Sequence, residues 1–408
     1  MKELVIGSYA PHLYGTDQHL DMLATAYHKG VTKRLAKLAE ADGSRASAEL
    51  FALYKTLSDS ALPVTARCWQ PEIGAVLACM SANNVEHAVI HGLFALHALG
   101  VGAHWGHRIA APLRLSMAGH LFDVDGAFSV QASADQIAIV RHDSGLEKLV
   151  FERQEGNWRL QGERPTALAW KYSAPVFLTQ SGFESVYLQS YIEPSADDVP
   201  EMIIDWPVRQ LEGDMAQFAA RSAPQIAAAM QLLAQTAPYY LPWIKPLFRG
   251  MGPGPLVDNN QRQSGSFSWH PGVFSCGFPL STPFLAEVIV HEMSHQHFML
   301  ADAVVPLVKA GRNQEIYFSS FKGKNRNIEK ILLTFHAVAN MVLFWHDFIT
   351  NTGDADPANR DQMALMLKHG HGLVKVLRTS DDMTEAGVGM FESQCRLLRE
   401  RGIVMGEA

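Results

Sequence analysis

Cysteine is scarce in this sequence. The four cysteines stand far apart and form no Cys-x-x-Cys pair. They are too few to cross-link a chain of 408 residues. A disulfide-rich secreted scaffold is therefore excluded, and a reducing cytoplasm suits the chain best. The four positions are Cys68, Cys79, Cys276 and Cys395.

Excess positive charge is also missing. The formal net charge is −7, and the Lys and Arg residues are scattered rather than gathered into a stripe. A protein that binds a polyanion usually carries such a stripe or patch. Nucleic acid is therefore not an expected partner.

Neither a secretion signal nor a membrane span is expected. The first seven residues lead directly into polar residues and a proline, without an apolar core and cleavage site. The most apolar stretch, Ile331 to Ile349, includes residues that would be costly in lipid. They are Thr334, His336, Asn340, His346 and Asp347. We expect this stretch to form a core helix in a cytoplasmic protein with no membrane partner.

The spacing of apolar residues predicts an α+β fold. From about 18 to 58 and from about 73 to 100, apolar residues recur at three-and-four spacing, which indicates amphipathic helices. From about 112 to 195, short alternating runs indicate an antiparallel sheet, with Asp125-Gly126 as an expected hairpin turn. Helical periodicity then returns. We expect a helical N-terminal part, an antiparallel sheet region in the middle and a mainly helical C-terminal part.

A chain of this length is long enough for more than one domain. We place a boundary near residue 200, where the alternating runs end. Residues 1–200 then form a helical and antiparallel-sheet region with no assigned role, and residues 201–408 form a metal-binding catalytic region. Trp158 and Trp170 in the sheet region are expected to anchor a core rather than to cage a ligand.

The sequence His291-Glu292-Met293-Ser294-His295 carries the clearest chemical signal. Pro283 opens a predicted helix that runs to about Leu300 and contains the motif. Histidines four residues apart lie on one face of a helix, so both rings can reach a single ion. The apolar residues before the motif predict that this helix is buried, where unused polar groups would be costly. We therefore expect a metal site on this helix.

The motif lacks the extension that zinc proteases of one large class share. Their pattern, HExxHxxGxxH, requires a glycine and a third histidine, but Phe298 and Ala301 occupy these positions. That class is therefore disfavoured. His297 faces another side of the helix and is expected at the surface or behind the ligands.

The third metal ligand must come from elsewhere in the chain. A predicted helix from Ile328 to about Ile349 offers both Glu329 and His336, seven residues apart and roughly on one face. We prefer His336, because it lies deep in an apolar run where an imidazole needs a partner. Asp302 is a candidate for fixing the tautomer of a ligating histidine.

Three segments of the C-terminal part carry a resemblance to a known family. They are Leu285-Ala-Glu-Val-Ile-Val-His291-Glu-Met-Ser-His295-Gln, Asp302-Ala-Val-Val-Pro306 and Tyr317-Phe-Ser-Ser-Phe-Lys-Gly-Lys-Asn-Arg326. Over residues 255–400 the chain resembles the HExxH-motif peptide-modifying proteins, which are 2-oxoglutarate-dependent peptide β-hydroxylases. Members commonly have a Tyr-x-Pro-Trp-Arg-like stretch before the second helix, where this chain has Tyr317 to Lys322 with Arg326 beyond. Either Lys322 or Arg326 can therefore take the cosubstrate-binding role.

The resemblance implies an oxidoreductase that binds Fe(II) and 2-oxoglutarate and hydroxylates a ribosomally made precursor peptide. His291, His295 and His336 would bind the iron, and Glu292 would orient a ligand or assist proton transfer. A guanidinium such as that of Arg326 matches a carboxylate with two parallel hydrogen bonds, whereas Lys322 offers a point charge. Nonhaem iron oxygenases hold the metal by three protein ligands on one side.

Two other functions remain open from the residues alone. In a zinc metallopeptidase, Glu292 would be the general base and Glu329 could replace His336 as a ligand. In a non-catalytic partner within a peptide-modifying complex, the metal would be structural or absent.

Overall fold

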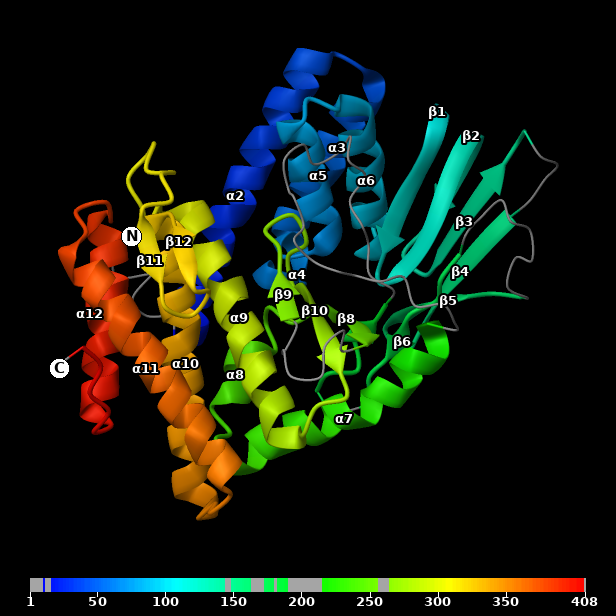
Figure 1. Ribbon diagram of the computed structural model, residues 1–408. Helices are drawn as coiled ribbons and strands as arrows, with labels where there is room; N and C mark the ends of the chain where they lie inside the picture. The colour runs from blue at the N-terminus through cyan, green and yellow to red at the C-terminus, as the bar shows by residue number, and fades with distance from the viewer. Residues whose placement is uncertain are drawn as a thin grey trace. The chain divides into compact units, whose positions relative to one another are not determined.

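In a computed structural model of the chain, residues 10–11, 16–143, 148–162, 172–179, 182–189, 215–255 and 264–406 are described. They confirm the expected α+β class, with helices first, an antiparallel sheet next and helices again in the C-terminal part (Figure 1). The chain forms two compact units. The sheet unit comprises His28–Pro224 and Phe248–Pro279, and the helical unit comprises Met1–Tyr27, Gln225–Leu247 and Leu280–Ala408. The boundary expected near residue 200 lies outside the described residues.

The sheet unit begins with helices that agree with the expected periodicity. After α2 (Thr16–Asp42), Gly43 with φ +64° allows the chain to turn, and Ser44 caps the next helix by accepting the Ser47 amide hydrogen at 3.2 Å. Asn84 caps α6 in the same way. The remaining helices are α3 (Arg45–Thr56), η1 (Leu57–Asp59), α4 (Val64–Cys68), α5 (Pro71–Ser81) and α6 (Val85–Ala98).

A five-stranded antiparallel meander follows these helices. Its strands are β1 (Ala103–Met117), β2 (His120–Ala132), β3 (Gln136–Arg141), β4 (Lys148–Gln154) and β5 (Asn157–Leu160), in this order. Ile90 and Phe94 of α6 pack with the buried face of the sheet, which includes Trp158. Trp158 is 2% exposed and donates its indole hydrogen to the Ala98 carbonyl at 2.9 Å, so its expected core role is confirmed. Trp170 lies outside the described residues.

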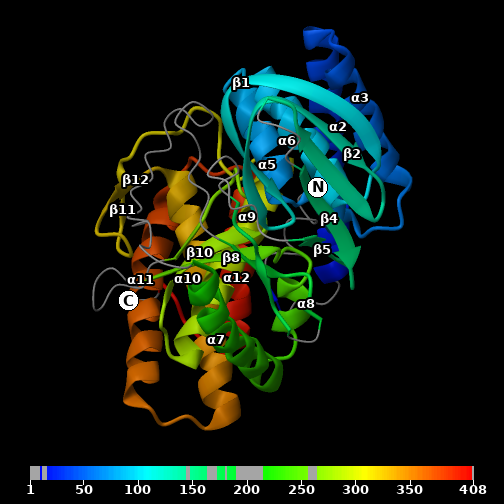
Figure 2. The same cartoon turned by 90° about the vertical axis from the view of Figure 1, so that its right-hand side faces the viewer.

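The hairpin turn expected at Asp125-Gly126 is wrong. The turn between β1 and β2 is made by Ala118 and Gly119, which both have positive φ, and Asp125-Gly126 lies inside β2. The register of β1 shifts between Ile109 and Leu113 opposite this pair, and β1 and β2 form a long curved ribbon (Figure 2). Asp-Gly favours positive φ, and here that conformation serves a strand irregularity rather than a turn.

A second, mixed sheet completes the sheet unit. Its order is β6-β7-β8-β10-β9, with parallel pairs β7/β8 and β8/β10. A side chain on Gly250 would lie 2.6 Å from the ring of Tyr187, so glycine permits this close approach of β8 to β7. The bounds are β6 (Val176–Phe177), β7 (Tyr187–Leu188), β8 (Gly250–Pro255), β9 (Ser264–Ser266) and β10 (Val273–Phe278).

Four long helices dominate the helical unit. Among them α10 packs against α9, α11 and α12, and the short β11/β12 hairpin lies beside α10 and α11. α10 is long and apolar enough to span a membrane, but 83% of its most apolar window is buried inside the structure, as expected for a core helix. The elements are α8 (Tyr240–Ile244), α9 (Thr282–Val304), β11 (Tyr317–Ser319), β12 (Lys324–Arg326), α10 (Ile328–Thr352), α11 (Pro357–Thr379) and α12 (Glu385–Glu400), after α7 (Met215–Thr236).

Glu72 connects α5 to the β1–β2 turn. Its buried carboxylate accepts hydrogen bonds from the Ser116 hydroxyl at 3.1 Å and from the Ala118 amide at 2.9 Å. Burial raises the pKa of Glu72, and the opposing charge of Arg249 lowers it by less. The strained turn residue Ala118 therefore has its amide hydrogen satisfied by a helix rather than by water.

Replacing Glu72 by alanine should lower the free energy of unfolding by about 2 kcal/mol. The substitution leaves a buried amide and a buried hydroxyl without their acceptor, which typically costs about 1–3 kcal/mol per group. Glu72→Gln keeps a carbonyl acceptor and should cost less. Urea unfolding followed by tryptophan fluorescence measures the difference, with exposed Glu40→Ala on α2 as the control. Equal effects of Glu72→Ala and Glu40→Ala would contradict this account.

Candidate metal centre

The HExxH motif lies in the middle of α9. Pro283 occupies the first turn after Ser281, as expected, and the helix continues to Val304, slightly beyond the predicted end. Residues before and after the motif are almost all buried, because α9 packs against α10. The helix is thus held on a rigid support on both sides of the motif.

The motif brings three metal-binding side chains together. The donor atoms of His291, Glu292 and His295 all lie within 4.8 Å of one another. The His291 Nε2 atom is 3.7 Å from the Glu292 Oε1 atom, and the two imidazole rings are 4.5 Å apart at 83°. The expectation that the two histidines share one helix face is confirmed.

Burial keeps both histidines neutral. It lowers the pKa of His291 to about 3 and the pKa of His295 well below its ordinary value, and the Lys322 charge lowers both further. A neutral imidazole has the lone pair that a metal ion needs. The buried Nδ1 atom of His295 has no hydrogen-bond partner among the described residues. Two neutral imidazoles beside the buried Glu292 carboxylate therefore suit a cation.

A network of polar side chains joins α9 to α10 and α12 directly behind the motif. Ser294 donates to the Val290 carbonyl at 2.7 Å and accepts from the Asn340 amide at 3.0 Å. Gln394 of α12 donates to the Asn340 side-chain carbonyl at 3.1 Å and to the His336 backbone carbonyl at 3.2 Å. The position of the motif is therefore set by three helices and not by α9 alone.

His336, the preferred third ligand, lies outside the compact group formed by His291, Glu292 and His295. It is fully buried in α10, its Nε2 atom lies 3.4 Å from the Asn340 amide nitrogen, and its ring lies 6.0 Å from that of Phe298. When Asn340 donates a hydrogen bond to the His336 Nε2 atom, the lone pair of that nitrogen is not available to an ion. Among the described residues, the compact donor group contains neither His336 nor Glu329. The third member of this compact group is Glu292.

Lys322 and Arg326, the two candidates for binding the cosubstrate, lie on the β11/β12 hairpin. Phe321 stacks near His291 with ring centres 6.1 Å apart, and the Lys322 Nζ atom lies 5.5 Å from the Phe321 ring centre. Burial lowers the pKa of Lys322, the Arg326 charge lowers it further, and Glu292 opposes this shift. The Arg326 Nε atom is buried without a hydrogen-bond partner among the described residues. The exposed Lys322 thus lies at the edge of the site, and its charge lowers the pKa of both His291 and His295.

Of the two positions expected for His297 the structure excludes the surface, and Asp302 makes a different contact from the expected one. His297 is not at the surface: it is 2% exposed, stacks on Trp243 with ring centres 4.3 Å apart, and lies 2.9 Å from the Trp243 carbonyl through Nε2. Asp302 accepts the Leu307 amide hydrogen at 2.8 Å, so it stabilises the chain leaving α9 rather than a ligand tautomer. The sequence around His297 does not predict that its ring stacks on Trp243, because the two residues are far apart in the chain.

Three further residues around the site were not predicted as site residues. Met341 places its sulfur 3.3 Å from the His291 Nδ1 atom, Phe321 stacks on His291, and Asn340 holds Ser294. Of these, Asn340 was detectable as a polar residue inside the most apolar stretch of the chain. The other two contacts depend on tertiary packing.

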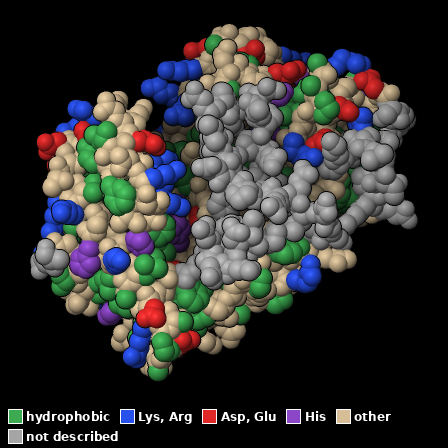
Figure 3. Space-filling model, in the orientation of Figure 1, with side chains coloured by type: hydrophobic (Ala, Val, Ile, Leu, Met, Phe, Trp, Pro, Cys, Tyr) green, Lys and Arg blue, Asp and Glu red, His purple; other side chains and the backbone are tan. Residues whose placement is uncertain are grey.

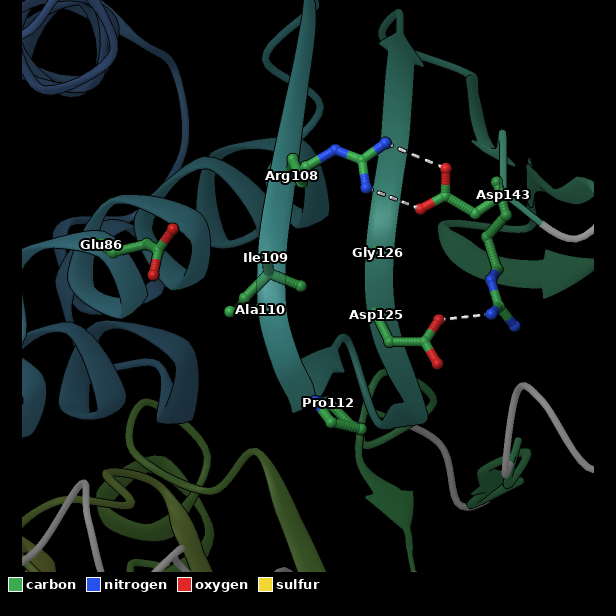
Figure 4. A pocket seen from close by; sticks show the side chains of 9 residues that line it. Glu86, Arg108, Ile109, Ala110, Pro112, Asp125, Gly126 and Asp143 are labelled. Atoms are coloured by element: carbon green, nitrogen blue, oxygen red, sulfur yellow. Dashed lines mark hydrogen bonds and ion pairs between the residues drawn. The ribbon is translucent and has the colours of Figure 1, made fainter.

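An open depression of about 610 Å³ in the sheet unit is a weaker candidate. Figure 4 shows that Arg108 points at Asp143, with which it pairs at 3.0 Å. Arg141, which also lines the depression, pairs with Asp125. The ion pairs balance the charges across β1, β2 and the end of β3. Glu86 adds a third carboxylate to the lining, so the depression has more acidic than basic groups and both of its arginines are already paired.

Comparison with protein-family models finds no match to this chain, and comparison with curated proteins finds none either. The functional argument therefore rests on the chemistry of the residues in the helical unit.

Replacing either His291 or His295 by alanine should lower the affinity for Fe(II) by roughly 100-fold or more. Removing a direct ligand should cost at least the 10–100-fold typical of the groups that support ligands. Anaerobic calorimetric titration measures the affinity, and exposed His104→Ala in the sheet unit is the control. Unchanged affinity in both site variants would contradict the metal centre.

The same titration identifies the third donor. If Glu292 completes the set, Glu292→Gln weakens metal binding strongly and His336→Gln does not. The reverse result would show that α10 turns His336 toward the ion when the metal binds.

Proposed function

We propose that this chain is an Fe(II)- and 2-oxoglutarate-dependent oxygenase that hydroxylates a side chain of a ribosomally made precursor peptide. The observation that carries the proposal is the position of Lys322 on the hairpin, directly after Phe321, whose ring stacks on His291. The Lys322 charge lowers the pKa of both His291 and His295. A cation next to a metal site is repelled unless an anionic ligand lies between them. A cosubstrate with two carboxylates meets this requirement.

The donor set also suits iron. Two histidines and one carboxylate with open positions opposite them are the usual ligands of nonhaem Fe(II) oxygenases. In this chain His291 and His295 would supply the imidazoles, and Glu292 the carboxylate. Both histidines are partly buried, and this burial lowers their pKa, which favours the neutral, ligating form of the imidazoles.

The bound iron and 2-oxoglutarate would supply the oxidising chemistry, with one oxygen atom of O₂ entering the substrate and the other entering succinate as CO₂ leaves. The protein's own contribution is positional. Ser294, Asn340 and Gln394 fix the motif, Phe321 covers one side of His291, and Lys322 receives an anion. The four cysteines are buried and free, which supports a reducing compartment such as the cytoplasm.

A zinc metallopeptidase is the second candidate, and one observation favours it. The Glu292 carboxylate lies with both histidine donors, where such an enzyme places the general base that deprotonates a metal-bound water. The two candidates make different products from the same peptide, so product analysis separates them.

The purified protein, incubated with Fe(II), 2-oxoglutarate, oxygen and a candidate precursor peptide from its genomic neighbourhood, should form succinate. The peptide should gain one oxygen atom, as measured by mass spectrometry. Succinate should not form when Fe(II) is omitted or when both His291 and His295 are replaced by alanine. Peptide cleavage with zinc as the metal and no succinate would overturn the oxygenase and favour the peptidase.

Lys322→Met should raise the KM for 2-oxoglutarate by roughly 10-fold or more, because a charge-assisted pair with a carboxylate contributes about 1.5–3 kcal/mol. The kcat at saturating 2-oxoglutarate should change less. Arg326→Met tests the other candidate in the same assay, and exposed Lys375→Met on α11 is the control. If Arg326→Met alone raises the KM, the guanidinium and not Lys322 binds the distal carboxylate.

A further inference from the structure

The segment from Lys309 to Lys330, here called the basic hairpin, differs in charge from the rest of the chain. It contains six Lys or Arg residues and two Glu residues, whereas the whole protein has a net charge of −7. It includes β11, β12 and their connecting turn. An acidic ligand would therefore be attracted to this segment and repelled by the rest of the protein.

One face of β11 is fixed to the helical unit. The Tyr317 hydroxyl donates to the Asp382 carboxylate at 2.7 Å and accepts from the Ser380 hydroxyl at 3.1 Å. Ser319 is fully buried and accepts the Lys322 amide hydrogen at 3.3 Å. Because strand side chains alternate between two faces, these contacts direct the intervening residues outward.

The outward face is apolar. Phe318 is 55% exposed and Ile316 is 59% exposed, the two highest values among the large exposed hydrophobic residues described. Figure 3 shows apolar side chains gathered over β11 and β12, with basic side chains around them. Lys324 on β12 is exposed and makes no ion pair with a described residue. This combination differs from an ordinary surface, where exposed apolar side chains stand singly.

The hairpin also has open strand edges. β11 pairs with β12, and within the described residues no third strand joins them. Each strand therefore keeps one edge to which an extended peptide can add. The turn of the hairpin carries Phe321 and Lys322 to His291, so a peptide lying along the hairpin is led to the metal-binding group.

We propose that the basic hairpin docks an extended, acidic segment of the peptide substrate. Apolar side chains of the peptide cover Ile316 and Phe318, and its carboxylates lie near Lys324. The identity of the occupant as substrate rests on the proposed function. A second copy of this chain is a poorer occupant, because two copies carry like net charge and would bring two basic hairpins together.

Fluorescence anisotropy with labelled synthetic peptides tests the docking. The probe is a capped peptide in which Val and Glu alternate, and two comparison peptides replace Glu by Lys or Val by Ser. The protein is the full chain with His291 and His295 both replaced by alanine, so that no metal is needed. The Val/Glu peptide should bind at least 10-fold more tightly than either comparison peptide, and its binding should weaken as salt rises.

Variants locate the binding surface. Phe318→Ser combined with Ile316→Ser should weaken binding of the Val/Glu peptide by roughly 10-fold, because two apolar contacts are lost. Lys324→Glu should weaken it by a similar factor. Val388→Ser on α12 removes another exposed apolar side chain, 42% exposed, and should leave binding unchanged. Circular dichroism checks that each variant is folded.

Three results would overturn the docking proposal: equal binding of the Lys-containing peptide, no effect of the hairpin variants, or concentration-dependent dimerisation that the hairpin variants abolish. Peptide binding and succinate formation are measured separately, so failure of the proposed function can be distinguished from failure of the docking proposal. Hairpin-dependent peptide binding without succinate formation contradicts the oxygenase and leaves the docking surface in place. Succinate formation that is insensitive to the hairpin variants contradicts the docking surface and leaves the oxygenase in place.

Discussion

The hydrogen bond from the Asn340 amide to the Ser294 hydroxyl joins the two central helices of the helical unit at the level of the metal-binding motif. Ser294 lies between the two histidines in sequence, and Asn340 is held in turn by Gln394 of α12. A buried polar group without a partner costs roughly 1–3 kcal/mol, so these side chains have one favourable arrangement. The helices must pack in that register, and the orientation of the histidines follows from it.

The same burial that requires this network also prepares the site for a cation. Water cannot solvate His291 or His295 well, so both imidazoles lose their protons and present lone pairs. The Glu292 carboxylate is fully buried beside them. A site of this kind is stabilised when an ion arrives, because the ion restores the electrostatic interactions that burial removed.

Much of this arrangement could be predicted from local sequence patterns. The α+β class, the buried α9 and α10, and the shared face of the two motif histidines follow from periodicity and from the spacing of His291 and His295. The donor partner could not be predicted in the same way. The sequence favours His336 because it lies in an apolar run, and the position of Asn340 on the same helix, 3.4 Å from the His336 Nε2 atom, is a contact that the apolar run does not predict. Similarly, Asp125-Gly126 has the residues of a turn, and strand pairing overrides them.

Charge balance is the physical argument that separates the two enzymatic functions. A divalent metal with one carboxylate keeps one uncompensated positive charge in the buried part of the site, and the exposed Lys322 ammonium adds a second positive charge at its edge. A metal-bound hydroxide, as in a zinc peptidase, cancels one of them, whereas the dianion 2-oxoglutarate cancels both. In a low-dielectric interior a remaining charge is expensive. The position of Lys322, more than the HExxH motif itself, therefore favours an anionic cosubstrate and the oxygenase.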